Sequence, residues 1–363
     1  MARRASGPRT LAVAALGAAL ATVAAAQGSW EIRSEDGRSS VKLGFLAVMR
    51  ADSEELADGE DAQNLYFRRL RLILGGRLAE KWSYFIDTDS PNLGKSDAAG
   101  VKNSGDIFIH DFVVTYEQSP AFKVDFGMIL VPLSRNTTQG AATHLASDYG
   151  PYSLLHSNAT QSRVGRDYGV QLRGAVAGGR LEYRGGVYDG ARGTDATEEL
   201  RFAGRLAYNF FDPDTGYLYT GNNLGARRML TFGVGFDRQD DYQALGADAF
   251  WDQPVGSDGS AFTLQGDYLR YDGGDTFATL PEQEAWLAEV GYLFGALRWQ
   301  PFVQWAARDL DDAALADETQ TWLGVNYRMA GHERVARFAW GRISTDGAPD
   351  RDVLQLTLQL YHF

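Results

Sequence analysis

The sequence contains no cysteine. Disulfide bridges, thiolate metal sites and thiol nucleophiles are therefore excluded, and stability has to come from the fold itself. Histidine is scarce as well: the chain has only His110, His144, His156, His332 and His362. These five show neither the spacing of metal ligands nor a helix motif that would hold a metal. The sequence thus gives no signal for a metal or any other cofactor.

Long hydrophobic runs are absent after the first 26 residues. No later segment has the roughly 18 consecutive apolar residues of a membrane helix. A chain of this kind can cross a bilayer only as a closed β-barrel, because every backbone N–H and C=O must be bonded within the lipid. The 41 Gly, 17 Tyr, 19 Phe and 8 Trp agree, since many short twisted strands with aromatic girdles need these residues.

The N-terminus is the one strongly apolar stretch. Arg3 and Arg4 precede a run of Ala, Leu, Val and Gly that ends at Ala24-Ala25-Ala26. This pattern predicts a signal peptide over residues 1–26 and a single mature domain over 27–363. Without the signal, 32 basic residues face 47 acidic ones, and this negative balance argues against nucleic acid as a partner.

Alternation of apolar and polar residues predicts an all-β fold, a transmembrane antiparallel barrel of about 16 strands. Phe122–Met128, for example, has apolar even positions and polar or glycine odd positions. The predicted strands cover 41–51, 64–78, 82–89, 107–117, 122–130, 167–175, 181–188, 201–211, 230–238, 244–251, 261–271, 285–294, 298–308, 319–328, 335–343 and 353–363. Residues 27–38 are expected to form a loosely ordered lead-in.

Short and long connections alternate along the predicted strands, as they do between the periplasmic and outer sides of such barrels. Two connections break the alternation, namely 212–229, which is too long, and 239–243, which is too short. The last strand has a conflict of its own. Tyr361 and Phe363 have the opposite parity to the leucine face of that strand, Leu354, Leu356, Leu358 and Leu360. We expect a β-bulge near Tyr361 to reconcile the two.

Residues 131–165 form the longest stretch between two strands. They carry Pro132, Pro151 and several glycines among small polar and charged residues. Such a segment can face water but cannot build a core, and compact domains rarely tolerate a loop of this length without a function. We therefore expect a third outer loop that folds into the barrel and narrows its lumen.

Several strings in sequence order resemble the phosphate-selective porin O and P family of outer-membrane channels. They are Phe67-Arg68-Arg69-Leu70-Arg71-Leu72, Gly127–Leu133, Gly165–Leu172, Leu181–Gly190 and the stretch 212–225. The resemblance implies a sixteen-stranded barrel in the cell outer membrane, assembled as a homotrimer, with an infolded third loop. It also implies passive diffusion of small anionic solutes such as phosphate, with no catalysis.

In this family a ladder of basic residues selects phosphate, since guanidinium forks bind phosphate oxygens in pairs. The candidate pore-lining and anion-binding residues here are Arg69, Arg71, Arg135, Arg163, Arg173, Arg184, Arg205 and Lys123. Arg201, Arg298 and Arg308 share the inward parity. Inward carboxylates such as Asp87, Asp125 and Asp167 could instead pair with these cations. The arginines would then line a water-filled lumen without selecting anions.

Three alternatives remain open on sequence alone. A general porin, non-selective or weakly cation-selective, needs no unpaired arginines. A barrel hydrolase would need a loop serine such as Ser153 or Ser157 beside His144 or His156, without any nucleophile motif in support. A secreted soluble β-protein would bury one sheet face against another. Acidic loops over 54–61 and 309–318 are expected to be solvated, and could bridge to lipopolysaccharide through divalent cations.

Overall fold

The computed structural model describes residues 30–55, 61–97, 99–153, 165–192 and 199–363. Its strands are β1 (Trp30–Arg33), β2 (Ser40–Glu55), β3 (Asp61–Ala79), β4 (Trp82–Asp89), β5 (Phe108–Ser119), β6 (Phe122–Leu130), β7 (Arg166–Val176), β8 (Leu181–Tyr188), β9 (Arg201–Asn209), β10 (Met229–Gln239), β11 (Tyr242–Val255), β12 (Ser260–Asp272), β13 (Gln283–Leu293), β14 (Trp299–Leu310), β15 (Glu318–Ala330), β16 (Arg334–Thr345) and β17 (Arg351–His362).

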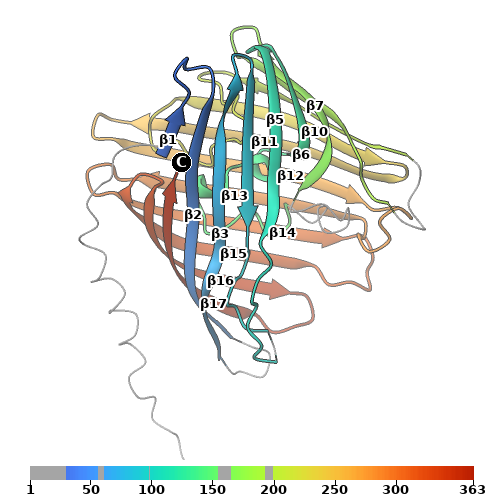
Figure 1. Cartoon of the computed structure of the whole chain (residues 1–363). Coiled ribbons are helices and arrows are strands. Elements are labelled where there is room, and N and C mark those ends of the chain that lie inside the picture. Colours follow the sequence, from blue (N-terminus) through green and yellow to red (C-terminus); the bar gives the residue numbers. More distant parts are fainter. Residues whose placement is uncertain (1–29, 56–60, 98, 154–164, 193–198) are drawn as a thin grey trace, which may run out of the picture.

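Strands β2 to β17 close into one antiparallel barrel, seen from the side in Figure 1. Each strand pairs with its sequence neighbour, and β17 returns to β2 with His362 opposite Phe45 and Val353 opposite Glu54. Closure removes the exposed sheet edges that lipid would not tolerate. In the part of the chain that the structure describes, no helix is long and apolar enough to span a membrane.

The predicted sixteen-stranded barrel is confirmed, and the predicted ranges correspond to β2–β17. The lead-in is the exception, because part of residues 27–38 forms β1, which pairs with the start of β2. There β2 extends beyond the end of β17 and leaves a free edge, which β1 occupies. The Trp30 ring lies 4.8 Å from the His362 ring, and Figure 1 places β1 beside the C-terminus.

The two faces of the barrel differ as the alternation predicts. Large apolar side chains such as Leu72, Phe232, Val234 and Phe236 are exposed on the outer face. The residues between them are mostly polar, small or charged and are buried inside. An apolar outside and a polar inside are what a membrane barrel requires.

Two β-bulges place consecutive polar residues on the inside. On β3, Val48 pairs with Arg69 but Met49 pairs with Phe67, so Arg68 is the extra residue. On β5, the register shifts between Asp87 and Thr88, which makes His110 the extra residue. A bulge shifts the parity of the strand by one position. Arg68 and Arg69 therefore both reach the lumen, as do His110 and Asp111.

The expected bulge near Tyr361 is wrong. β17 pairs with β2 and with β16 in unbroken register. Tyr361 and Phe363 instead point into the barrel, where Phe363 packs against Phe85 with ring centroids 5.9 Å apart. Glycines make room for the terminal ring: a Cβ at Gly44 or Gly75 would lie 2.7 Å from it.

Candidate functional site

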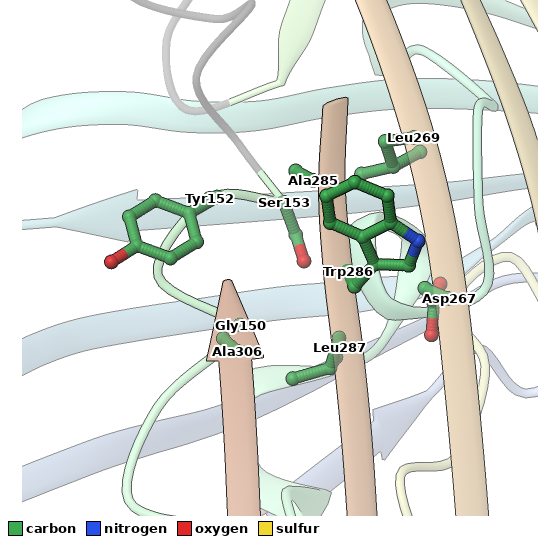
Figure 2. A pocket seen from close by; sticks show the side chains of 9 residues that line it. All are labelled: Gly150, Tyr152, Ser153, Asp267, Leu269, Ala285, Trp286, Leu287 and Ala306. Carbon is green, nitrogen blue, oxygen red and sulfur yellow. The ribbon is translucent and has the colours of Figure 1, made fainter. Parts of the chain in front are cut away.

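The long connection between β6 and β7 lies inside the barrel as far as it is described. Nearly every residue from 131 to 153 is buried. Two short 3-10 turns, Asn136–Thr138 and Ala141–Thr143, are its only helical pieces in the described range 131–153. Figure 2 shows Gly150, Tyr152 and Ser153 of this loop against the wall formed by β12, β13 and β14, and the gap between them has no room for a water molecule. We call residues 131–153 the inner loop.

One carboxylate of the inner loop binds three guanidiniums of the barrel wall. Asp148 accepts from Arg50 Nη1 at 2.9 Å and from Arg68 Nε at 3.0 Å, and it also pairs with Arg69. Burial alone would raise the pKa of Asp148, but the three guanidiniums hold this pKa well below its usual range. With three cations around one anion, the cluster keeps a positive excess.

Two further guanidiniums face the inner loop without an acidic partner. Arg328 and Arg337 are buried, and in the described ranges no carboxylate oxygen lies within 4.0 Å of either. Arg328 Nη2 donates to Gln300 Oε1 at 2.6 Å, and Arg337 donates to Asn326 Oδ1. We call Arg50, Arg68, Arg69, Arg328 and Arg337 the basic wall.

Two arginines of the basic wall, Arg50 and Arg337, belong to one row of register partners across six strands. The row comprises Tyr66, Arg50, Thr357, Arg337, Asn326 and Gln300, all buried. Its donors point at carbonyl oxygens of the inner loop: Asn326 Nδ2 lies 2.9 Å from Leu145 O and Arg50 Nη2 lies 3.1 Å from Ser147 O. The row therefore holds the loop by its backbone acceptors.

The adjoining stretch of wall, on β11 to β13, holds the same loop by its backbone donors. The Arg135 N–H donates to Asp248 Oδ2 and the Asn136 N–H to Asp267 Oδ1, both at 3.2 Å. We call Asp248, Asp252, Asp267 and Glu289 the acidic wall. The carbonyl groups of the loop thus face arginines, and its N–H groups face carboxylates. This arrangement gives the loop one electrostatically favoured orientation in the lumen.

Between β3 and β11, each of the following buried guanidiniums pairs with at least one carboxylate. The pairs are Arg71 with Asp87 and Asp89, Arg166 with Asp111, Arg173 with Asp125, Arg184 with Glu182, Arg201 with Asp167 and Asp237, and Arg205 with Asp248. The pairing that the sequence left open therefore dominates this part of the lumen.

The structure places the predicted candidates as follows. Arg71, Arg173, Arg184 and Arg205 are buried in the lumen in the pairs just described, and Arg69 is buried in its pair with Asp148. Arg135 pairs with Asp214 at 3.0 Å and lies 3.8 Å from the centre of the Phe250 ring. Lys123 is half-buried and pairs with Glu117 at 3.1 Å. Arg163 lies outside the described residues. Arg298 was wrongly expected to face inward: it is exposed in the turn after β13, with a φ of +61°.

Sequence reasoning missed four of the five arginines of the basic wall. Arg50 continues the inward parity of Leu46 and Val48 and could have been found by that signal. Arg337 has the inward parity of Val335 and could have been found in the same way. Arg68 could not have been found, because the bulge that turns it inward cannot be recognised from the alternation of apolar and polar residues.

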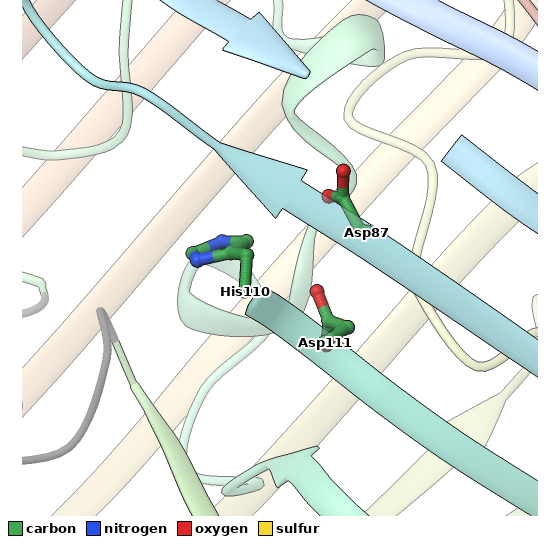
Figure 3. Close-up of side chains that lie close together, drawn as sticks. All are labelled: Asp87, His110 and Asp111. Atoms are coloured by element: carbon green, nitrogen blue, oxygen red, sulfur yellow. The ribbon is translucent and has the colours of Figure 1, made fainter. Parts of the chain in front are cut away.

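Asp87, His110 and Asp111 come together on β4 and β5, as Figure 3 shows, and their ligand-type atoms lie within 4.8 Å of one another. Two guanidiniums already form hydrogen bonds with this group. Arg71 bonds Asp87 at 2.8 Å and contacts His110 Nε2 at 3.2 Å, and Arg166 bonds Asp111 at 3.0 Å. Cations at hydrogen-bond distance compete with a metal ion for the same oxygens, so we interpret the group as an ion-pair network.

The described residues bring no serine hydroxyl to His144, one of the two bases of the hydrolase alternative. The His144 ring packs edge-on against Tyr149 with centroids 4.1 Å apart. Neither ring nitrogen of His144 has a hydrogen-bond partner in the described chain, so no serine is placed against this base. His156 and Ser157 lie outside the described residues.

A second segment enters the barrel from the side of the short turns. It is the long connection 210–228 between β9 and β10, and it meets the inner loop through Gly140 N to Tyr219 O at 2.9 Å and Tyr219 N to Thr138 O at 3.0 Å. The Tyr219 ring lies 4.3 Å from the guanidinium carbon of Arg184 and 4.8 Å from that of Arg135. The two inserted segments therefore support each other.

Replacing Tyr219 tests this support. We expect Tyr219→Ala to lower the free energy of unfolding by about 3–5 kcal/mol, because a buried ring that faces guanidiniums is removed. Tyr219→Phe keeps the ring and loses only the hydroxyl, which accepts from Arg205 Nε at 3.3 Å, so it should cost about 1 kcal/mol. Urea unfolding in lipid vesicles measures both, and equal costs would contradict the role of the ring.

His332, in the turn between β15 and β16, makes a pH-dependent contribution to the free energy of unfolding. Burial and the neighbouring Arg328 lower the pKa of His332 to about 3. Between this pKa and the unfolded value near 6.5, only the unfolded state takes up the proton, so stability is lost as pH falls through this window. We expect His332→Gln to reduce the slope of unfolding free energy between pH 4 and 6 by about 1.4 kcal/mol per pH unit. An unchanged slope in urea titrations would contradict this.

A closed sixteen-stranded barrel with an apolar exterior, a charged lumen and an inserted loop defines an outer-membrane porin channel. The family model described as phosphate-selective porin O and P matches residues 46–317, and the chain belongs to this family. It therefore resides in the outer membrane. Among curated proteins, none matches the sequence.

Solved structures share the fold at low sequence identity. OmpF of Salmonella typhi, solved in complex with daunomycin, is 12% identical, with a TM-score of 0.59 over 91% of this chain and 100% of that chain. The outer-membrane channel DcaP of Acinetobacter baumannii is 13% identical, with a TM-score of 0.54 over 91% and 99%. OccK9 of Pseudomonas aeruginosa is 13% identical, with a TM-score of 0.53 over 89% and 98%. At these identities the likeness establishes the fold alone.

Proposed function

We propose that this porin is selective for small anions such as phosphate, and that the inner loop and the basic wall form its selective region. The supporting observation is the excess of guanidinium at the loop: three arginines share Asp148, and Arg328 and Arg337 have no carboxylate oxygen within 4.0 Å in the described ranges. In a narrow, poorly screened passage, such an excess attracts anions and offers bidentate donors to phosphate oxygens. A cavity of about 280 Å³ lies at this region, with Arg68 and Asp148 in its lining.

A general porin, non-selective or weakly cation-selective, is the second candidate. The acidic wall favours it, because Asp252, Asp267 and Glu289 have no basic side chain within 4.0 Å in the described ranges. Asp267, however, is covered by the inner loop and bonded to its backbone. Arginines of the basic wall bond the loop backbone as well. The five guanidiniums of the basic wall face Asp148, whereas the four carboxylates of the acidic wall face Arg205, so the remaining charge is slightly positive and favours anions.

The reversal potential of the purified protein in a planar bilayer under a salt gradient tests the proposal. We expect an anion-selective potential and a chloride current that is reduced by millimolar phosphate. Cation preference, or chloride current indifferent to phosphate, would favour the general porin instead. Absence of channels in a protein with a heat-modifiable barrel fold would contradict a porin function altogether.

Further parts of the proposal concern processing and assembly. We propose that residues 1–26 are removed after Ala26, that residues 27–363 form a single domain, and that the mature chain forms a homotrimer in contact with lipid and lipopolysaccharide. N-terminal sequencing of the protein from outer membranes tests the first point. The molecular mass of the detergent complex, measured by light scattering, tests the trimer.

A further inference from the structure

The lumen contains an aromatic cavity at the short-turn end of the barrel. Its volume is about 390 Å³, and it lies beneath the inner loop. Four parts of the chain build it: the barrel wall with Ile73 and Phe85, the C-terminus with Phe363, the inner loop with Ala142, and the segment 210–228 with Tyr217. Lumen-facing positions of a porin are expected to be polar, so this apolar lining needs a reason of its own.

The rings that line the cavity are fixed relative to one another. Phe85 packs edge-on against Phe363, with centroids 5.9 Å apart and planes at 75°. On its other side Phe85 lies 6.0 Å from the Tyr217 ring. These spacings are those of favourable aromatic pairs. A set of rings held in place before binding loses little conformational entropy when it receives another ring.

The size and lining match a site for a small molecule. Ligand sites commonly have 300–1,000 Å³ and a mostly apolar lining with a few polar groups. Benzene already fits an apolar cavity of about 150 Å³. The present cavity therefore accommodates one substituted ring. Thr115 and Thr143 donate their hydroxyl protons to Asp125 and to the Gly140 carbonyl, so their oxygens can accept a hydrogen bond from a ligand, and Thr220 also lines the cavity.

The charges around the cavity indicate an uncharged ligand. Two guanidiniums line it, and both are already bonded: Arg71 to Asp87 and Asp89 at 2.8 and 2.9 Å, and Arg173 to Asp125 at 2.5 Å. Three carboxylates thus face two guanidiniums. Among the residues that line the cavity, no cation lacks a carboxylate partner, in contrast to the basic wall; Lys42 Nζ, which is not among them, lies 4.5 Å from the centre of the Phe363 ring.

We propose that this cavity is a binding site for small uncharged aromatic molecules, with Phe85, Tyr217 and Phe363 as the rings that contact the ligand. The site is separate from the basic wall and does not depend on anion selectivity. Its occupant would be a neutral aromatic solute that enters the channel, held by ring packing and by hydrogen bonds to threonine hydroxyls.

Calorimetric titration of the full folded protein in detergent tests the proposal with three matched probes. Benzamide carries a neutral ring, cyclohexanecarboxamide has the same amide without aromaticity, and benzoate has the ring with a negative charge. We expect benzamide to bind at least tenfold more tightly than either of the others. Equal binding of cyclohexanecarboxamide would overturn the aromatic site, tighter binding of benzoate would overturn the neutral class, and no binding of benzamide would overturn the site itself.

Matched variants locate the binding. Phe85→Leu should weaken benzamide binding at least tenfold, whereas Phe232→Leu, the same change on the exposed outer face, should leave it unchanged. Ala142→Phe fills the cavity and should abolish benzamide binding. Where either cavity variant fails to fold, the other provides the test. Benzamide affinity that is unaltered in a folded cavity variant would overturn the assignment, independently of the reversal potential that tests anion selectivity.

Discussion

Asp148→Asn is expected to raise the anion-to-cation permeability ratio about threefold to tenfold. The substitution removes the carboxylate that Arg50, Arg68 and Arg69 share, and so adds one net positive charge at the inner loop. A unit charge in a partly wet protein environment is worth up to about 4 kcal/mol at 4 Å, and salt in the lumen screens much of this. The reversal potential under a salt gradient measures the change.

The same variant should be less stable. Removing one partner of a buried ion pair costs about 3–5 kcal/mol when the remaining charge stays buried. We expect a smaller loss, about 2–3 kcal/mol, because 26% of the Asp148 side chain is exposed. Asp350→Asn, the same change at an exposed loop position, serves as the control and should alter neither property. Equal selectivity of the two variants would contradict a role of Asp148 in the charge of the lumen.

Arg337→Gln is expected to weaken the block of chloride current by phosphate about tenfold. Arg337 is a buried guanidinium beside the inner loop that has no carboxylate oxygen within 4.0 Å in the described ranges, so no direct ion pair neutralises the field of its charge in the lumen. A charge-assisted hydrogen bond is worth about 1.5–3 kcal/mol, and 1.4 kcal/mol corresponds to a factor of ten. The concentration of phosphate that halves the single-channel chloride current measures the effect.

Two further variants make the Arg337 result interpretable. Arg337→Lys keeps the charge but loses the planar fork, so it should retain anion preference and still weaken the phosphate block. Arg238→Gln removes an exposed arginine of β10 and should change neither. A phosphate block that is identical in the wild type and in Arg337→Gln, with both folded, would exclude Arg337 from the selective region.

The neutralised arginines provide a contrast within the same lumen. Arg173 and Arg184 were candidates by parity alone, yet each has a carboxylate at hydrogen-bond distance. The carbonyl oxygens of Tyr217 and Gly216 occupy the remaining donors of Arg184. Such arginines serve to hold the inserted segment 210–228, and their number says little about the ions that pass.

The sequence by itself determined the barrel. Because side chains alternate between lipid and lumen with a period of two, strands such as β4, β6 and β8 could be bounded to the residue from their pattern. The count of sixteen followed from the same alternation. β1 was not predicted, because an alternation over only four residues is too short to be recognised as a strand. The inward turn of Phe363 was misjudged because its space depends on Gly44 and Gly75, which belong to other strands.

The tertiary structure alone decided which charges remain available. The row that joins Arg50 to Arg337 runs across β2, β17 and β16, which come from opposite ends of the chain. Arg68 enters the lumen through a bulge, and Asp148 reaches it from a loop that has no periodic pattern. Compensation between charges depends on distances of a few ångströms across strands, and these distances exist only once the barrel has closed around its inner loop.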